Sequence, residues 1–173
     1  MDLKAFVRDV PDFPRKGIVF KDITPLIASP EAFADSIRQM AARVAKPEAV
    51  VAIESRGFIF GAPLALHWGV PFVPARKFGK LPGRTVRQVY SLEYGEDTLE
   101  LHADALRAGW DVVVVDDLLA TGGTAAATIS LVRQLGAHVR AALFAIELVG
   151  LGGRQRLDPT RVEALISVPA GTG

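Results

Sequence analysis

Short apolar runs alternate along the chain with longer segments in which apolar residues recur at helical spacing. Five runs rich in valine, isoleucine and alanine are typical of strands buried on both faces; they cover Ala49–Ile53, Val70–Ala75, Val112–Val115, Val139–Ile146 and Val162–Val168. The segments between them predict helices over Ser29–Ala45, Phe58–Trp68 and Gly123–Leu135. Buried strands that alternate with helices imply a parallel sheet covered on both faces, so the expected class is α/β.

Local signals mark where the predicted helices begin and end. Ser29 followed by Pro30 is typical of a helix start. Gly69 and Gly136 are typical of helix ends. At the N-terminus, a shared apolar side predicts a short amphipathic helix over Asp2–Asp9; its members are Leu3, Phe6, Val7 and Val10.

Residues 76–102 interrupt the alternation. Residues 76–87 carry five cations, two glycines and one proline without any acid, which favours a flexible basic loop. Val89–Tyr94 and Thr98–His102 predict a hairpin that turns at Gly95–Asp97. We therefore expect a mostly parallel open sheet flanked by helices within one domain over 1–173. A small N-terminal hood over about residues 1–30 and a flexible lid and hairpin over 76–102, with 78–92 as the lid itself, complete it.

Composition narrows the class of protein. The 173 residues carry a formal net charge of +1, which gives no sign of a nucleic-acid or membrane partner. The absence of cysteine excludes disulfides, thiolate metal sites and a cysteine nucleophile. The N-terminus lacks an apolar signal core, and no apolar run reaches the roughly 18 residues of a membrane span. We expect a cytoplasmic protein.

The most informative segment is 112–124, Val-Val-Val-Val-Asp-Asp-Leu-Leu-Ala-Thr-Gly-Gly-Thr. A buried strand ends in Asp116 and Asp117, and a loop of small residues leads into a helix. Loop N–H groups and a helix N-terminus bind phosphate, whereas carboxylates at the carboxyl edge of a sheet accept hydrogen bonds from sugar hydroxyls. The layout predicts a site for a phosphorylated sugar. A strand and turn that serve packing alone would leave the paired carboxylates unexplained.

This segment resembles the phosphoribosyl pyrophosphate motif of the type I phosphoribosyltransferases at all thirteen positions. The resemblance runs in order from about Phe13 to Val168 and implies the fold of that family. It also implies Mg²⁺ as cofactor, held mainly by substrate and water without a dedicated protein metal site. Members usually form homodimers, and we expect one here.

The N-terminal loop Phe13–Leu26 resembles the base-binding hood of the family members that act on adenine. The resemblance implies that Phe20 stacks on the base, that the Val19 backbone reads its edge and that Lys21 lies close by. Members often carry arginine where this chain has Lys21, and lysine offers a point charge in place of a planar fork. The alternative is an ordinary strand with Phe20 in the core.

Three more segments resemble the family. In Glu54-Ser55-Arg56-Gly57-Phe58, Arg56 offers planar donors for pyrophosphate, and Gly57 permits close backbone approach. In the basic segment, the best candidates for contacts to leaving pyrophosphate are Arg76, Lys77 and Lys80. Tyr90–Gly95 resembles a signature whose glutamate and tyrosine, here Glu93 and Tyr94, line the closed site.

Taken together, the resemblance implies an enzyme of purine salvage that transfers the 5-phosphoribosyl group from phosphoribosyl pyrophosphate to adenine, giving AMP and pyrophosphate. The expected catalytic residues are Arg56, Glu93, Asp116 and Asp117. The expected substrate-binding residues are Val19, Phe20, Lys21, Glu54, Ser55, Arg76, Lys77, Lys80, Tyr94, Ala120, Thr121, Gly122, Gly123 and Thr124.

Three alternatives stay open. A phosphoribosyltransferase for hypoxanthine, guanine or xanthine would share the fold, but the hood and the Tyr90–Gly95 segment argue against it. A non-catalytic sensor of purine or phosphoribosyl pyrophosphate that regulates transcription would need a DNA-binding module, for which the few residues before the hood leave no room. A plain nucleotide-binding α/β domain would leave the hood unexplained.

Overall fold

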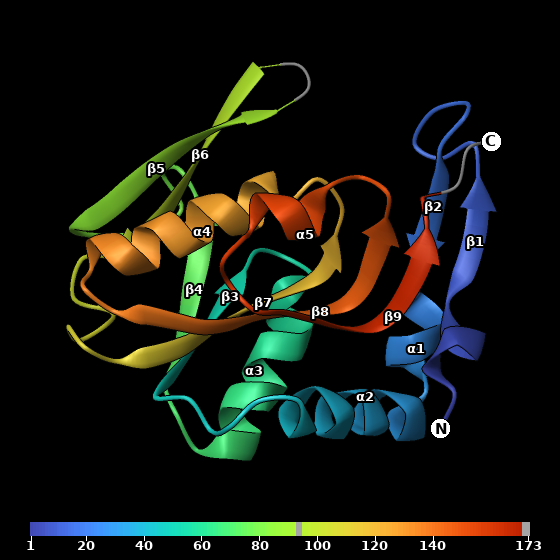
Figure 1. Cartoon of the computed structure of the whole chain (residues 1–173), viewed down its shortest axis with the longest axis horizontal. Coiled ribbons are helices and arrows are strands. Elements are labelled where there is room, and N and C mark those ends of the chain that lie inside the picture. Colours follow the sequence, from blue (N-terminus) through green and yellow to red (C-terminus); the bar gives the residue numbers. More distant parts are fainter. Residues whose placement is uncertain (93–94, 171–173) are drawn as a thin grey trace.

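The computed structural model describes residues 1–92 and 95–170. A seven-stranded sheet with the order β5-β6-β4-β3-β7-β8-β9 forms its centre (Figure 1). The strands are β3 (Ala49–Ile53), β4 (Phe72–Lys77), β5 (Thr85–Leu92), β6 (Gly95–His102), β7 (Asp111–Leu119), β8 (His138–Val149) and β9 (Val162–Pro169). The pairs from β4 to β9 are parallel, and β5 and β6 join as an antiparallel hairpin. The mostly parallel sheet expected from the sequence is confirmed.

Helices cover both faces of this sheet (Figure 1). One face carries α1 (Thr24–Ala28), α2 (Pro30–Ala42) and α3 (Gly57–Trp68); the other carries α4 (Gly123–Gln134) and α5 (Gly153–Arg156). Successive valines of β7 enter opposite cores: Val113 and Val115 pack on the α2–α3 side, whereas Val112 and Val114 pack on the α4 side. Burial on both faces explains why β7 begins as an unbroken valine run.

The hood is a separate two-stranded sheet. After a 3-10 helix η1 (Leu3–Phe6), β1 (Arg8–Pro11) pairs antiparallel with β2 (Val19–Asp22). Figure 1 shows this hairpin facing the carboxyl ends of β7, β8 and β9. The amphipathic helix expected over Asp2–Asp9 is therefore wrong beyond Phe6, because Arg8 and Asp9 pair across the hairpin with residues of β2.

The 76–102 segment is more ordered than expected. The turn predicted at Gly95–Asp97 is wrong, because these residues already belong to β6 and pair with the end of β5. β5 begins at Thr85, inside the basic segment that we expected to be a loop. Buried Glu100 anchors this start: its carboxylate accepts hydrogen bonds from Gly79 N at 2.9 Å, Thr85 Oγ1 at 3.0 Å and Arg87 Nε at 2.8 Å.

Several boundaries also differ. β7 continues through Asp116 and Asp117 to Leu119, because β8 runs beside it and supplies hydrogen-bonding partners up to Glu147. The two acids therefore lie within the strand and do not follow it. The helix expected to reach Ala45 ends at Ala42, and the short helices α1 and α5 were not predicted.

Candidate active site

The carboxyl ends of β3 and β7 open onto a cleft of about 310 Å³, with the β4–β6 hairpin region along one side. Its polar lining residues are Glu54, Ser55, Arg56, Lys77, Tyr90, Asp97, Asp116, Asp117 and Thr124. A neighbouring pocket of about 210 Å³ is formed by the loop Ala120–Thr124 and shares Asp116 and Thr124 with the cleft. The structure thus brings together the loop, the two acids and predicted site residues from two other segments, Glu54–Arg56 and Lys77.

The loop Ala120–Thr124, called the phosphate loop below, ends at the N-terminus of α4. Gly122 adopts a left-handed conformation with φ +79°, and a Cβ at this position would lie 2.9 Å from the Gly153 carbonyl oxygen. Both constraints require glycine. The first N–H groups of a helix lack partners within it and carry partial positive charge, so this loop has the chemistry of an anion site.

The two aspartates differ in their surroundings. Asp117 is 5% exposed and its Oδ2 lies 2.8 Å from Arg56 Nε. Asp116 Oδ1 accepts a hydrogen bond of 2.8 Å from the Asp117 backbone N–H. Burial, together with the neighbouring Asp117 carboxylate, raises the pKa of Asp116 well above its ordinary value. Asp117 therefore has a cationic partner, whereas Asp116 lies beside a second carboxyl group.

Gly57 fixes the distance between α3 and the acid pair. A Cβ at Gly57 would lie 2.9 Å from Asp116 Oδ1 and 3.0 Å from the Val115 carbonyl oxygen. The preceding Glu54–Ser55 peptide bond is cis. The close approach that the sequence assigned to Gly57 is confirmed, and the group approached is the Asp116 carboxylate.

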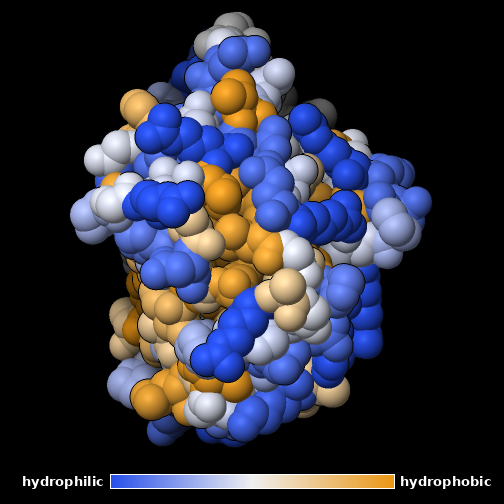
Figure 2. Space-filling view, turned by 90° about the vertical axis from the view of Figure 1, so that its left-hand side faces the viewer, coloured by the Kyte–Doolittle hydropathy of each residue, from blue (hydrophilic) through white to orange (hydrophobic). Residues whose placement is uncertain are grey.

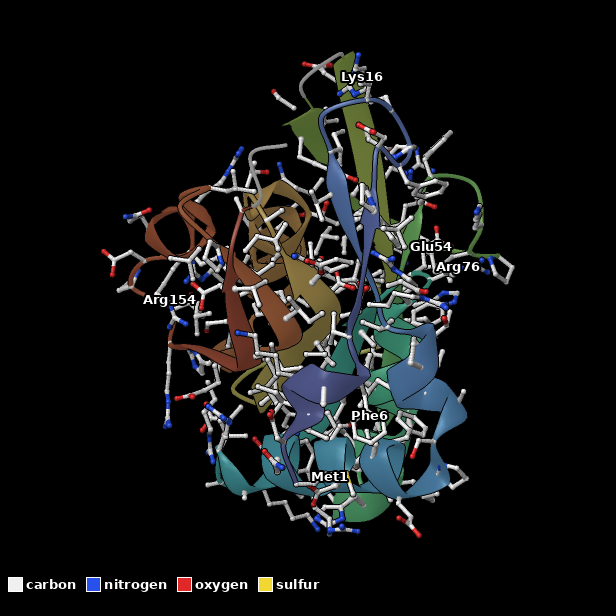
Figure 3. The ribbon with its side chains drawn as sticks, turned by 90° about the vertical axis from the view of Figure 1, so that its right-hand side faces the viewer. Met1, Phe6, Lys16, Glu54, Arg76 and Arg154 are labelled. Carbon is white, nitrogen blue, oxygen red and sulfur yellow. The ribbon has the colours of Figure 1, made fainter. Side chains whose placement is uncertain are left out.

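Glu54 contacts the cations at the end of β4 and just after it. Its carboxylate accepts hydrogen bonds from Arg76 Nε at 3.1 Å and Nη2 at 3.0 Å and from the Lys77 N–H, and Lys80 Nζ lies 3.5 Å away. Figure 3 shows Glu54 and Arg76 side by side, with Arg154 on the opposite side of the molecule. Burial opposes ionisation of Glu54, but the Lys77 N–H and Arg76 outweigh it and hold its pKa below the ordinary value.

A second polar chain crosses the cleft from the hairpin to the phosphate loop. Lys77 Nζ lies 2.8 Å from Asp97 Oδ2, which also accepts a hydrogen bond of 3.3 Å from the Tyr90 hydroxyl. Tyr90 and Thr124 both line the cleft. The hydrogen bond to Asp97 raises the pKa of Lys77. Sequence reasoning missed Asp97 because the residue was assigned to a turn, where an exposed aspartate carries no signal.

The hood reaches the cleft through Phe20. The half-buried Phe20 ring lies edge-on to Phe13 at 5.2 Å, and Arg56 Cζ lies 5.2 Å from the Phe20 centroid. Phe20 therefore borders the site and does not belong to either core. Lys21 is 8% exposed, and its Nζ pairs with Asp9 Oδ1 at 2.7 Å.

Two predicted site residues cannot be placed in the cleft. Glu93 and Tyr94 lie outside the described residues. Within residues 1–92 and 95–170, histidine, aspartate and glutamate side chains form no group of three or more that suits a metal ion. No helix in the same ranges is long and apolar enough to cross a membrane.

Comparisons with known proteins point to one family. The model of the phosphoribosyl transferase domain matches residues 25–161. An adenine phosphoribosyltransferase from Carboxydothermus hydrogenoformans is 54% identical over 96% of this chain and 99% of its own. The crystal structure of one from Thermoanaerobacter pseudethanolicus superposes with a TM-score of 0.93 at 50% identity, covering 96% of this chain and 98% of that one.

A third relative was solved with ligands. The adenine phosphoribosyltransferase from Saccharomyces cerevisiae, complexed with an imino-altritol bisphosphate and adenine, is 42% identical with a TM-score of 0.88. The match covers 95% of this chain and 96% of the yeast chain.

Proposed function

This chain belongs to the adenine phosphoribosyltransferases within the phosphoribosyl transferase family, and we propose that its cleft transfers the 5-phosphoribosyl group from phosphoribosyl pyrophosphate to adenine. The products are AMP and pyrophosphate, as in purine salvage. The observation that carries the proposal is the contiguity of the phosphate loop, the acid pair and the cations in one cleft. The adenine named for the yeast relative supports the choice of base.

The charges of the cleft suit this displacement. As the bond to pyrophosphate breaks, positive charge grows on the ribosyl ring and negative charge on the leaving group. We assign Asp116 and Asp117 to the ribose, and the phosphate loop to the 5′-phosphate, where it fixes the sugar for attack. The leaving pyrophosphate would meet Arg56, Arg76, Lys77 and Lys80. Glu54 would hold Arg76 and Lys80 in place, and Ser55 would line the cleft beside them.

A magnesium ion fits the donor set of the cleft. Mg²⁺ prefers hard oxygen ligands and keeps several from water and substrate. Asp116 and Asp117 offer such oxygens beside the ribose position. When bound, the ion would be held mainly by substrate and water and would supply charge stabilisation to the pyrophosphate, while the protein would fix the position of the substrate.

The remaining assignments follow the family resemblance. Phe20 would stack on adenine while the Val19 backbone and Lys21 lie at its edge. Glu93 and Tyr94 would close over the base, with Glu93 handling a ring proton, as part of a lid that excludes water. The hood, this lid and the sheet would form one catalytic domain.

We further propose that two copies form a homodimer that acts in the cytoplasm. Hydrophobic residues gather in the middle of the face that carries β5 and β6, bordered by hydrophilic ones (Figure 2). Exposed apolar residues of the chain include Leu66, Phe78 and Val89. Contiguous apolar surface of this kind often marks a protein interface.

The proposed reaction is tested by supplying phosphoribosyl pyrophosphate and Mg²⁺ with adenine, hypoxanthine, guanine or xanthine in separate assays. We expect AMP with adenine and no nucleotide from the other three bases. Equal use of another purine would show that the hood does not select adenine. Binding of adenine without AMP formation would indicate a sensor.

A further inference from the structure

Arg156 lies against the phosphate loop but belongs to a segment that no feature of the sequence connected with it. The last residue of α5, Arg156 places its Nη1 3.7 Å and its Cζ 3.8 Å from the point where a Cβ on Gly123 would stand. Gly123 is the first residue of α4, directly after the left-handed Gly122. Figure 1 shows α5 beside this end of α4. The guanidinium group of Arg156 therefore lies close to the backbone of the phosphate loop.

The position of α5 is fixed by backbone contact. A Cβ on Gly153 would lie 2.3 Å from the Ala120 carbonyl oxygen, so α5 and the phosphate loop meet with no side chain between them. Arg154 clamps the same turn: its Nε and Nη2 lie 3.0 and 2.6 Å from the Glu147 carboxylate, and its Nη1 donates to the Val162 carbonyl oxygen at 2.6 Å. Arg156 therefore projects from a rigid support.

The two arginines of α5 differ in their partners. The Arg154 side chain is held by Glu147 and Val162, whereas the Arg156 side chain has no hydrogen bond or ion pair within residues 1–92 and 95–170. An exposed arginine of this kind remains available to an incoming anion. Its five donors in a planar fork suit phosphate oxygens.

The phosphate loop itself offers little formal charge. The residues that line its pocket are Asp116, Leu118, Leu119 and Ala120–Ala125, which include a carboxyl group and no cation. A 5′-phosphate seated there would meet backbone N–H groups, the hydroxyls of Thr121 and Thr124 and the α4 dipole, none of which carries a full positive charge. Arg156 is a cation that the structure holds beside these groups and that the reaction described above does not use.

We propose that Arg156 is a binding residue for the 5′-phosphate of the phosphoribosyl group, with Gly153 and Arg154 positioning it. This proposal rests on the proposed function of the phosphate loop. It distinguishes Arg156 from Arg56 and Lys77, which are assigned to the pyrophosphate end of the same substrate.

The test compares ligands that differ only in the 5′-phosphate. For Arg156→Gln, we expect AMP and ribose 5-phosphate to bind about tenfold more weakly by calorimetry, while adenosine and ribose are unaffected. The KM for phosphoribosyl pyrophosphate should rise by about the same factor with little change in kcat. Arg156→Lys should fall between wild type and Arg156→Gln.

Arg133→Gln is the matched control, because Arg133 lies in the last turn of α4, at the end remote from the phosphate loop. It should bind all four ligands as the wild type does. Unchanged AMP binding in Arg156→Gln, or equal weakening of AMP and adenosine, would overturn the proposal. If the wild type binds ribose 5-phosphate in an Arg156-dependent manner but forms no AMP, the proposed reaction fails and the assignment of Arg156 stands.

Discussion

Replacing Gly57 with alanine tests whether the gap between α3 and Asp116 governs turnover. The new methyl would lie 2.9 Å from Asp116 Oδ1, whereas carbon–oxygen contacts are comfortable at about 3.3 Å or more. Either the carboxylate or the helix start must therefore yield by about 0.4 Å. Asp116 Oδ1 is also the acceptor for the Asp117 N–H, so a shift disturbs both acids.

The expected effect on folding is small because two terms oppose each other. Alanine is favoured over glycine within a helix by up to about 1 kcal/mol. Overpacking costs about 1–3 kcal/mol. The free energy of unfolding should therefore fall by only about 0–3 kcal/mol. A misplacement of about 1 Å in a site can cost about 10²-fold in rate, so we expect kcat to fall by at least about tenfold.

Gly61→Ala provides the matched control on the same helix. Its methyl would lie 2.4 Å from Ala52 Cβ, in the core between α3 and β3 and not at the acid pair. This contact is tighter than that at Gly57, so Gly61→Ala should lose more stability in urea unfolding and less kcat per folded molecule. If Gly57→Ala keeps full turnover, or if the two variants lose kcat in proportion to stability, the reasoning is refuted.

Three further outcomes follow from the site. Asp116→Asn should lower kcat strongly. In the wild type, burial and Asp117 raise the pKa of Asp116, so the folded state keeps a proton that the unfolded chain loses. The wild-type free energy of unfolding therefore falls as pH rises between the pKa of Asp116 in the unfolded chain and its pKa in the folded state. Asp116→Asn should remove this contribution and flatten the pH dependence of stability. Urea unfolding from acidic to neutral pH measures this. Glu54→Gln should raise the KM for phosphoribosyl pyrophosphate by about tenfold, since Arg76 and Lys80 lose their charged anchor; steady-state kinetics with adenine saturating would show it. Chelation of Mg²⁺ should abolish AMP formation but leave the melting temperature of the substrate-free protein unchanged, because the ion is proposed to rest mainly on substrate; a lowered melting temperature would contradict that.

Features decided by local sequence could be predicted. The valine run of β7 is readable because a strand buried on both faces needs apolar residues at every position. The phosphate loop is readable because a left-handed residue and a close backbone approach both demand glycine, and Gly122 meets both demands.

Features decided by partners distant in sequence could not be predicted. β1 forms because it pairs with β2, although its own residues are mostly exposed and show no alternation. The start of β5 inside the basic segment depends on Glu100, a buried acid that accepts hydrogen bonds from Thr85 and Arg87 of β5 and from Gly79 before it. Buried acids are rare, so neither composition nor spacing indicates such a residue.

Charge is distributed unevenly along the cleft, and no single sequence motif indicates this distribution. Arg56 with Asp117, and Lys77 with Asp97, are balanced pairs. Glu54, by contrast, faces both Arg76 and Lys80 with one carboxylate, which leaves positive charge in excess at the end of β4.

At the β7 side of the cleft, Asp116 lies beside the Asp117 carboxylate and has no ion-pair partner of its own within the described residues. A substrate with a polyanionic leaving group and a ring that turns cationic is therefore favoured in one orientation, with pyrophosphate at β4 and ribose at β7. Because the balanced pairs hold their side chains in place before binding, that orientation costs little additional ordering.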